Sequence, residues 1–175
     1  MLREGIILSL SSTKEETEKL IEINASNPWM FPYMEDTIEM IGDLARFEED
    51  KENLMKKYKE NIFLVSDFNK WLNNVSPRTR KTYVLNVVDF ADNYLLEKEK
   101  MSLIEGYTES DLFVASIEKY HTRNTISKYI SALRKFIKFL RDTNHITERE
   151  CELALEELNL ADVYDTSELI YRCCN

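Results

Sequence analysis

Apolar side chains recur every three to four residues along most of this chain, which is the spacing of α-helices with one buried face. The clearest stripe follows Thr122 and comprises Ile126, Tyr129, Ile130, Leu133, Phe136, Ile137 and Leu140. Another follows Ser76-Pro77 and comprises Tyr83, Val84, Val87, Val88, Ala91, Tyr94 and Leu95. The 175 residues include only 3 Gly and 3 Pro, whereas sheets and long loops use more of both. We therefore predict an all-α protein.

Hydroxyl residues precede several of the predicted helices and can cap their first turns. The clearest candidates are Thr13, Ser76, Thr122 and Thr147. Thr13 and Thr147 are each followed three residues later by Glu, the pattern of a capping box, and Pro77 suits the position after a cap. These residues predict four helix starts.

Four further segments are predicted less directly. Residues 33–59 follow a helical pattern, but the polar run 48–52 is either a solvated turn of one long helix or a break between two. Ser66 predicts a helix start with Phe68 on its inner face, and either Thr108 or Ser110 predicts the start of a helix containing Phe113. The tail from Asp162 is weakly patterned and is either a last helical turn or a frayed end.

Charge divides the chain into acidic ends and a mildly basic middle, within a net charge of -9. Residues 1–60 hold 8 Lys/Arg against 14 Asp/Glu, residues 61–150 hold 14 against 12, and residues 151–175 hold 1 against 6. Together with the helix pattern, this predicts an acidic helical N-terminal segment (1–60), a helical domain (61–160) and a short C-terminal tail (161–175). Since a local patch governs nucleic-acid affinity more than the total charge does, the basic middle keeps DNA binding open.

The composition excludes several other classes of protein. No apolar run approaches the roughly 18 residues that a membrane span needs. The N-terminus is too short and too acidic downstream for a signal peptide, and the odd set of Cys151, Cys173 and Cys174 fits a reducing compartment. These cysteines have no His cluster to complete a zinc site. We expect a soluble cytoplasmic protein without a metal site, a cofactor or a membrane.

Two helix starts share an unusual distribution of cations. The segments 76–83 and 122–129 each open with a hydroxyl residue, carry Thr three positions on and Tyr seven positions on, and place Lys or Arg in or beside the first turn. Acidic side chains are the ones that stabilise a helix N-terminus, because the helix dipole is positive there. Cations set against the dipole therefore indicate a surface that binds an anion, and phosphate is the obvious candidate.

Segments between about Phe63 and Asn159 also match a known domain in their order and spacing. They are 68–72, 76–83 with Phe90 and Tyr94-Leu95, 125–136 ending in Phe139-Leu140, and 144–146. Together they resemble the N-terminal SAM-like, core-binding domain of tyrosine recombinases and phage integrases. The resemblance implies a four- or five-helix bundle that clamps one side of duplex DNA, with a role in DNA integration or recombination or in its regulation.

The resemblance also implies which side chains contact DNA, namely those of the two helices that follow Ser76 and Thr122. Ser127, Ser131 and Arg134 share one face opposite the apolar stripe, as an outer surface requires. A basic outer face is more often simply solvated surface, and the aromatic residues Tyr83 and Tyr129 are expected in the core. The implied contacts are Arg78, Thr79, Arg80, Lys81, Arg123, Asn124, Thr125, Ser127, Lys128, Ser131, Arg134, Lys135 and Lys138.

Catalytic residues are not expected. Tyrosine recombinases cut DNA with a separate C-terminal domain that carries Arg, Lys, His and a nucleophilic Tyr, and the residues after Leu160 are too few to form it. The only histidines are His121 and His145, both in predicted connections, and Tyr164 and Tyr171 lack an Arg/His cluster. We therefore expect no enzyme activity and no small-molecule substrate.

Two rival interpretations stay open. The acidic ends could bind a basic partner protein or mask the basic patch, which makes the chain a protein-interaction or regulatory module that has lost DNA binding. The Leu-bearing helix predicted at 151–160 could dock onto a second copy of the chain or onto a recombinase protomer. A small enzyme is the third interpretation, and no catalytic constellation supports it.

Overall fold

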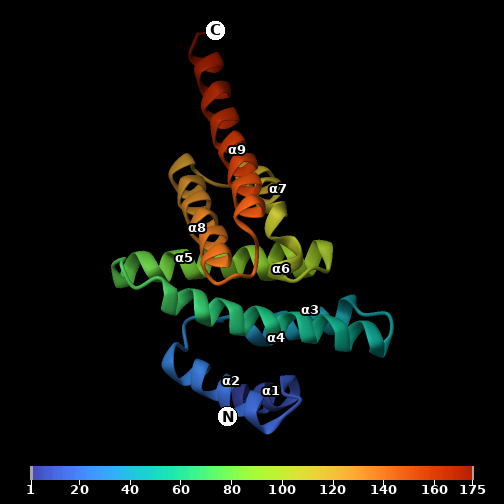
Figure 1. Ribbon diagram of the computed structural model, residues 1–175. Helices are drawn as coiled ribbons and strands as arrows, with labels where there is room; N and C mark the ends of the chain where they lie inside the picture. Colours follow the sequence, from blue (N-terminus) through green and yellow to red (C-terminus); the bar gives the residue numbers. More distant parts are fainter. Residues whose placement is uncertain (1, 175) are drawn as a thin grey trace.

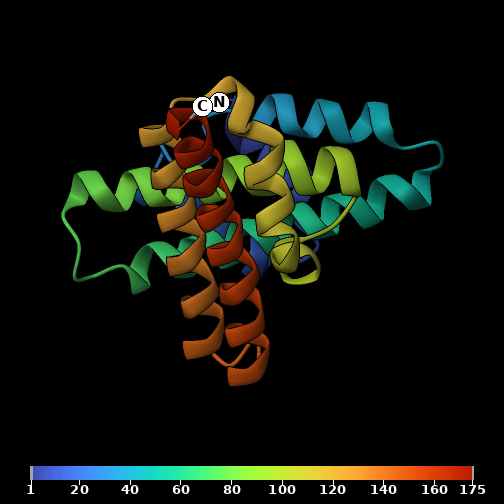
Figure 2. The same cartoon turned by 90° about the horizontal axis from the view of Figure 1, so that it is seen from above.

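The helices are stacked in tiers, seen from the side in Figure 1 and from above in Figure 2. The computed structural model describes the backbone of residues 2–174 and the side chains of residues 3–161. At one end lie α1 (Leu2–Leu10) and α2 (Lys14–Ser26), followed by α3 (Met34–Leu44) and the long α4 (Glu48–Trp71). Next comes α5 (Pro77–Asp89), which continues as the π-helix η1 (Phe90–Glu99).

The opposite end is formed by the helices that follow η1. Short helices α6 (Leu103–Gly106), η2 (Tyr107–Glu109), α7 (Ser110–Ile117) and η3 (Glu118–Tyr120) lead to α8 (Arg123–Asp142) and α9 (Glu148–Cys174). Figure 2 shows α8 and α9 side by side across α5, and Figure 1 shows α9 extending beyond α8. The described residues are helical with connecting turns and contain no strand, so the predicted all-α class is confirmed.

The predicted helix caps are present in the structure. Backbone amides donate to the hydroxyl of Thr13 at 3.1 Å, of Ser76 at 3.2 Å, of Thr122 at 3.3 Å and of Thr147 at 3.1 Å. In each case the donor is the amide three residues on, and Pro77 occupies the first turn of α5. Each hydroxyl therefore satisfies an amide that the helix itself leaves without a partner.

Several predicted boundaries were wrong. Ser66 does not begin a helix, because it lies buried inside the 24 residues of α4, where its neighbours pack against the core. Neither Thr108 nor Ser110 caps α7, since the residue before that helix is Glu109 and the Ser110 hydroxyl donates to the Tyr107 carbonyl at 2.6 Å. The polar run 48–52 is the first turn of α4, and the break comes just before it, after Leu44.

The ends of the predicted segments fall inside helices. Residues 60 and 61, where the N-terminal segment was separated from the helical domain, are consecutive positions of α4. The residues of the predicted tail continue the backbone helix α9 as far as Cys174. The side chains of Tyr164, Tyr171, Cys173 and Cys174 lie outside the described residues.

One hydrophobic core joins all of the tiers. Phe68 of α4 is fully buried between Phe136 and Phe139 of α8, with ring centroids 5.4 Å away in both cases. Phe31, which precedes α3, packs edge-on against the buried Tyr58 of α4 at 6.3 Å. Helix α4 therefore packs against the N-terminal part of the chain and also against α8.

None of the described helices is both long enough and apolar enough to cross a lipid bilayer.

Candidate functional site

The two cation-bearing helices meet at a surface groove between α5 and α8. The groove has a volume of about 340 Å³ and is lined by Arg78, Thr79, Thr82, Tyr83, Ser127, Lys128 and Ser131. Figure 2 shows α8 crossing α5. We call this set of residues the α5–α8 groove.

Helix geometry explains which side chains reach the groove. On α5, Thr79 and Thr82 are three residues apart, and on α8, Ser127 and Ser131 are four apart, so each pair lies on one face. The Thr79 hydroxyl accepts a hydrogen bond from the Ser76 hydroxyl at 2.9 Å, and the Thr82 hydroxyl donates to the Arg78 carbonyl at 3.1 Å. Short hydroxyl side chains on both walls leave room for a ligand between the longer Arg78 and Lys128.

The electrostatics of the groove differ from those of the whole chain. Its lining holds two cations and four aliphatic hydroxyls but no carboxylate, although the chain carries 32 Asp/Glu. The first turns of α5 and α8 also contain no acidic residue. The groove is therefore suited to a hydrogen-bond acceptor with negative charge.

A polar contact fixes the crossing of the two helices. The Tyr129 hydroxyl of α8 donates to Asp89 Oδ2 at the end of α5, at 2.6 Å. Burial and this bond to the Asp89 carboxylate raise the pKa of Tyr129 well above its ordinary value, so the phenol stays protonated and continues to donate. Tyr129 is half-buried and therefore belongs to the packing of the crossing, as predicted.

The structure brings together some of the predicted contact residues but not all of them. Those that line the groove are Arg78, Thr79, Ser127, Lys128 and Ser131. Arg123, Asn124 and Thr125 occupy the first turn of α8 outside the lining, where the Thr125 hydroxyl pairs with that of Thr122 at 3.0 Å. Arg80 is half-buried on α5 and does not line the groove.

The remaining predicted cations lie beside other parts of the molecule. The Lys81 ammonium lies 5.6 Å from the ring centre of Trp29, and Arg134 Nε donates to Asn159 Oδ1 of α9 at 2.9 Å. Lys135 lines a separate hollow of about 370 Å³ beside Trp71, the last residue of α4, and residues 72–75, which lead to α5. Burial raises the pKa of the Cys151 thiol of α9, and the ammonium of Lys138 is close enough to oppose that rise.

Two lining residues were missed by the sequence analysis. Thr82 lies four residues after Arg78, so helical spacing alone was enough to place it on the same face. Tyr83 was expected in the core; it is half-buried and packs against the core, as Tyr129 does, but it also lines the groove.

Comparison with protein-family models, curated proteins and solved structures found no match to this chain.

Proposed function

We propose that this chain is a DNA-binding module that holds the phosphate backbone of duplex DNA in the α5–α8 groove. The observation that supports this most directly is the lining: Arg78 and Lys128 flank four hydroxyls, and no carboxylate is present. Arg and Lys neutralise phosphates, and Ser and Thr hydroxyls donate to phosphate oxygens. Thr79, Ser127 and Ser131 would be the donors, because the Thr82 hydroxyl already donates to the Arg78 carbonyl.

The proposal includes the integrase-like interpretation of residues 61–160. A SAM-like bundle of the core-binding type would present its helices after Ser76 and Thr122 to DNA, and these are the helices whose crossing forms the groove. In this role the chain binds sites during DNA integration or recombination, or regulates those processes, in the cytoplasm. The proposed role is binding, without cleavage of the DNA by this chain.

The structure narrows the set of side chains that the proposal requires. Lys81 and Arg134, which the sequence suggested as contacts, are turned towards Trp29 and Asn159. Arg78 and Lys128 face the groove from opposite walls and are both exposed. A phosphate between them would be contacted from both helices at once.

The test is the affinity of the Arg78→Ala, Lys128→Ala double variant for a labelled duplex of about 30 base pairs. One charge-assisted hydrogen bond contributes roughly 1.5–3 kcal/mol, so the loss of both cations is expected to weaken binding at least about tenfold. Fluorescence anisotropy at about 0.1 M salt, where the Debye length is about 10 Å, measures this directly.

The matched control is Arg46→Ala with Lys14→Ala, which removes the same two charges from exposed positions outside the groove. Its affinity is expected to stay within about twofold of the unmodified chain, because distant exposed charges are largely screened. Equal losses in both variants would show that only total charge matters and would contradict the groove as the site.

A further inference from the structure

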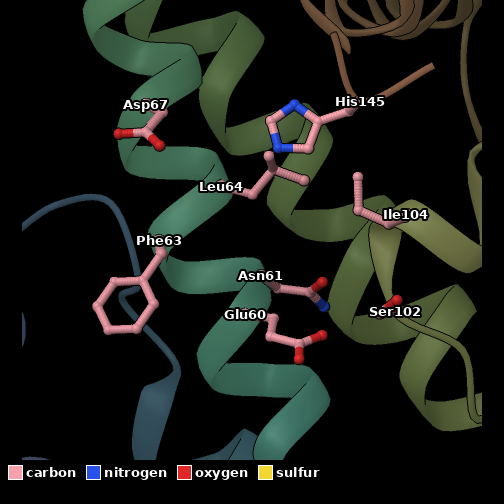
Figure 3. Close-up of a pocket in the computed structure, with 8 residues that line it drawn as sticks. All are labelled: Glu60, Asn61, Phe63, Leu64, Asp67, Ser102, Ile104 and His145. Carbon is pink, nitrogen blue, oxygen red and sulfur yellow. The ribbon is translucent and has the colours of Figure 1, made fainter. Parts of the chain in front are cut away.

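A second hollow, which we call the Asn61 hollow, lies between α4, α6 and the turn that joins α8 to α9. It has a volume of about 260 Å³ and is lined by Glu60, Asn61, Phe63, Leu64, Asp67, Ser102, Ile104 and His145. Figure 3 shows these side chains. Its character is opposite to that of the α5–α8 groove, because its lining contains two carboxylates and neither Lys nor Arg.

The two carboxylates are available to a ligand. Glu60 and Asp67 are exposed, seven residues apart on one face of α4, and the described part of the chain provides neither with an ion pair or a hydrogen bond. Seven residues of α-helix rise about 10 Å, so the two negative charges are separated by that distance along the helix. Among the described residues no group of three or more His, Cys, Asp or Glu could hold a metal ion, which favours an organic cation.

A buried amide supplies an independent sign of a missing partner. Asn61 is 1% exposed, and its Oδ1 accepts a hydrogen bond from the Leu103 amide at 2.9 Å. Its Nδ2 has no hydrogen-bond partner among the described residues, although a buried donor without a partner is costly. Figure 3 shows the amide reaching from α4 towards Ser102, inside the hollow. A ligand that fills the hollow would have to offer Asn61 an acceptor such as a carbonyl.

The walls between these polar groups are apolar. Leu64 and the 39%-exposed Ile104 face each other across the hollow. Glu60 and Phe63 also line a larger hollow of about 830 Å³ on the α1–α2 side, so the two hollows adjoin along α4. The recess therefore continues beyond the size of a single side chain, which favours a segment of polypeptide over a small molecule.

We propose that this hollow docks an extended basic segment of a partner protein. An extended chain has free main-chain carbonyls, as Asn61 Nδ2 requires, whereas a helix has used most of its own. In a polyproline II conformation, residues three apart lie on one face and are separated by about 9 Å. Two cations at that spacing match Glu60 and Asp67, and an aliphatic side chain between them fits against Leu64 and Ile104. This inference is independent of the α5–α8 groove.

The probe is the synthetic peptide Ac-Gly-Arg-Leu-Pro-Arg-Gly-NH2, and the control peptide carries Gln in place of both Arg. Titration is followed by the ¹H–¹⁵N NMR signals of the intact chain. We expect saturable shifts of the Asn61 side-chain amide and of the Leu103 amide with the Arg peptide, and smaller, non-saturating shifts with the Gln peptide.

Variants of the chain then test whether binding of the peptide depends on the charges of Glu60 and Asp67. Glu60→Gln with Asp67→Asn is expected to weaken binding of the Arg peptide roughly five- to tenfold, as two solvent-exposed ion pairs would. Glu22→Gln with Asp43→Asn removes the same charges elsewhere and is expected to leave binding unchanged. The proposal is overturned if the Asn61 signal does not respond, if both peptides act alike, or if both variants lose affinity equally.

Discussion

At the scale of single residues, the carboxyl group of Asp92 is the most unusual feature of the core. Asp92 lies on η1, is 7% exposed and faces α3, where the Thr37 hydroxyl donates to its Oδ2 at 3.5 Å. Its Oδ1 has no hydrogen-bond partner among the described residues. Burial raises the pKa of Asp92 to about 8, the Thr37 bond opposes that rise, and the nearby Asp89 carboxylate adds to it.

This shift makes folding depend on pH in a definite direction. The carboxyl group of Asp92 titrates near 3.8 in the unfolded chain and near 8 in the folded one. Between these values the folded state keeps a proton that the unfolded state has released, so stability falls as pH rises. The stabilisation is complete below the unfolded pKa and is lost as the pH passes through the folded pKa.

Replacing the Asp92 carboxyl group tests whether it causes this pH dependence of stability. Asp92→Asn keeps the shape and removes the charge, so its thermal midpoint is expected to exceed that of the unmodified chain at pH 8.5 and to change less between pH 5 and 8.5. Scanning calorimetry across that range measures both effects. Asp36→Asn, at an exposed position of α3, serves as the control, and equal pH dependence in all three proteins would contradict the assigned burial.

At the scale of helices, local chemistry made some boundaries predictable and packing hid others. The hydroxyls of Ser76 and Thr122 act within their own first turns, so sequence alone was sufficient to locate them. Ser66 has the same chemistry but lies in the middle of α4, where contacts with α8 decide the structure. The missed helix α6 did carry a local signal, since Ser102 and Glu105 form a capping box.

The cap of α8 can be tested against a hydroxyl that caps nothing. Thr122→Ala is expected to lower the free energy of unfolding by about 1 kcal/mol, because it leaves the Thr125 amide without its acceptor. Thr108→Ala removes an exposed hydroxyl that does not cap α7 and is expected to change stability by less than about 0.5 kcal/mol. Urea unfolding measures both, and equal losses would contradict the assigned cap.

The site was less predictable than the helices because it depends on contacts between distant segments. The repeated motif indicated that α5 and α8 carry related surfaces. However, Lys81 lies beside Trp29 and Arg134 donates to Asn159, and both of these partners are outside the two motifs. The Asn61 hollow gave no pattern in the sequence, since its walls come from α4, α6 and the turn after α8.

At the scale of the whole molecule, two surface hollows differ in the sign of the charged side chains that line them. The α5–α8 groove has no carboxylate, and the Asn61 hollow has no Lys or Arg. The N-terminal residues cannot be removed to test masking of the groove, because a cut after residue 60 would divide α4 and remove buried core residues such as Tyr58. Point variants in each surface are the appropriate tools.

If the α5–α8 groove binds phosphates of duplex DNA, as proposed, the affinity for DNA must fall as the salt concentration rises. Each phosphate contact contributes about 0.9 to the slope of log affinity against log salt concentration. Anisotropy titrations of a duplex of about 30 base pairs at several salt concentrations should therefore give a steep slope for the unmodified chain. The slope should be shallower by about 1.8 for Arg78→Ala with Lys128→Ala. Unchanged anisotropy at low salt, or an identical slope in the variant, would contradict the account.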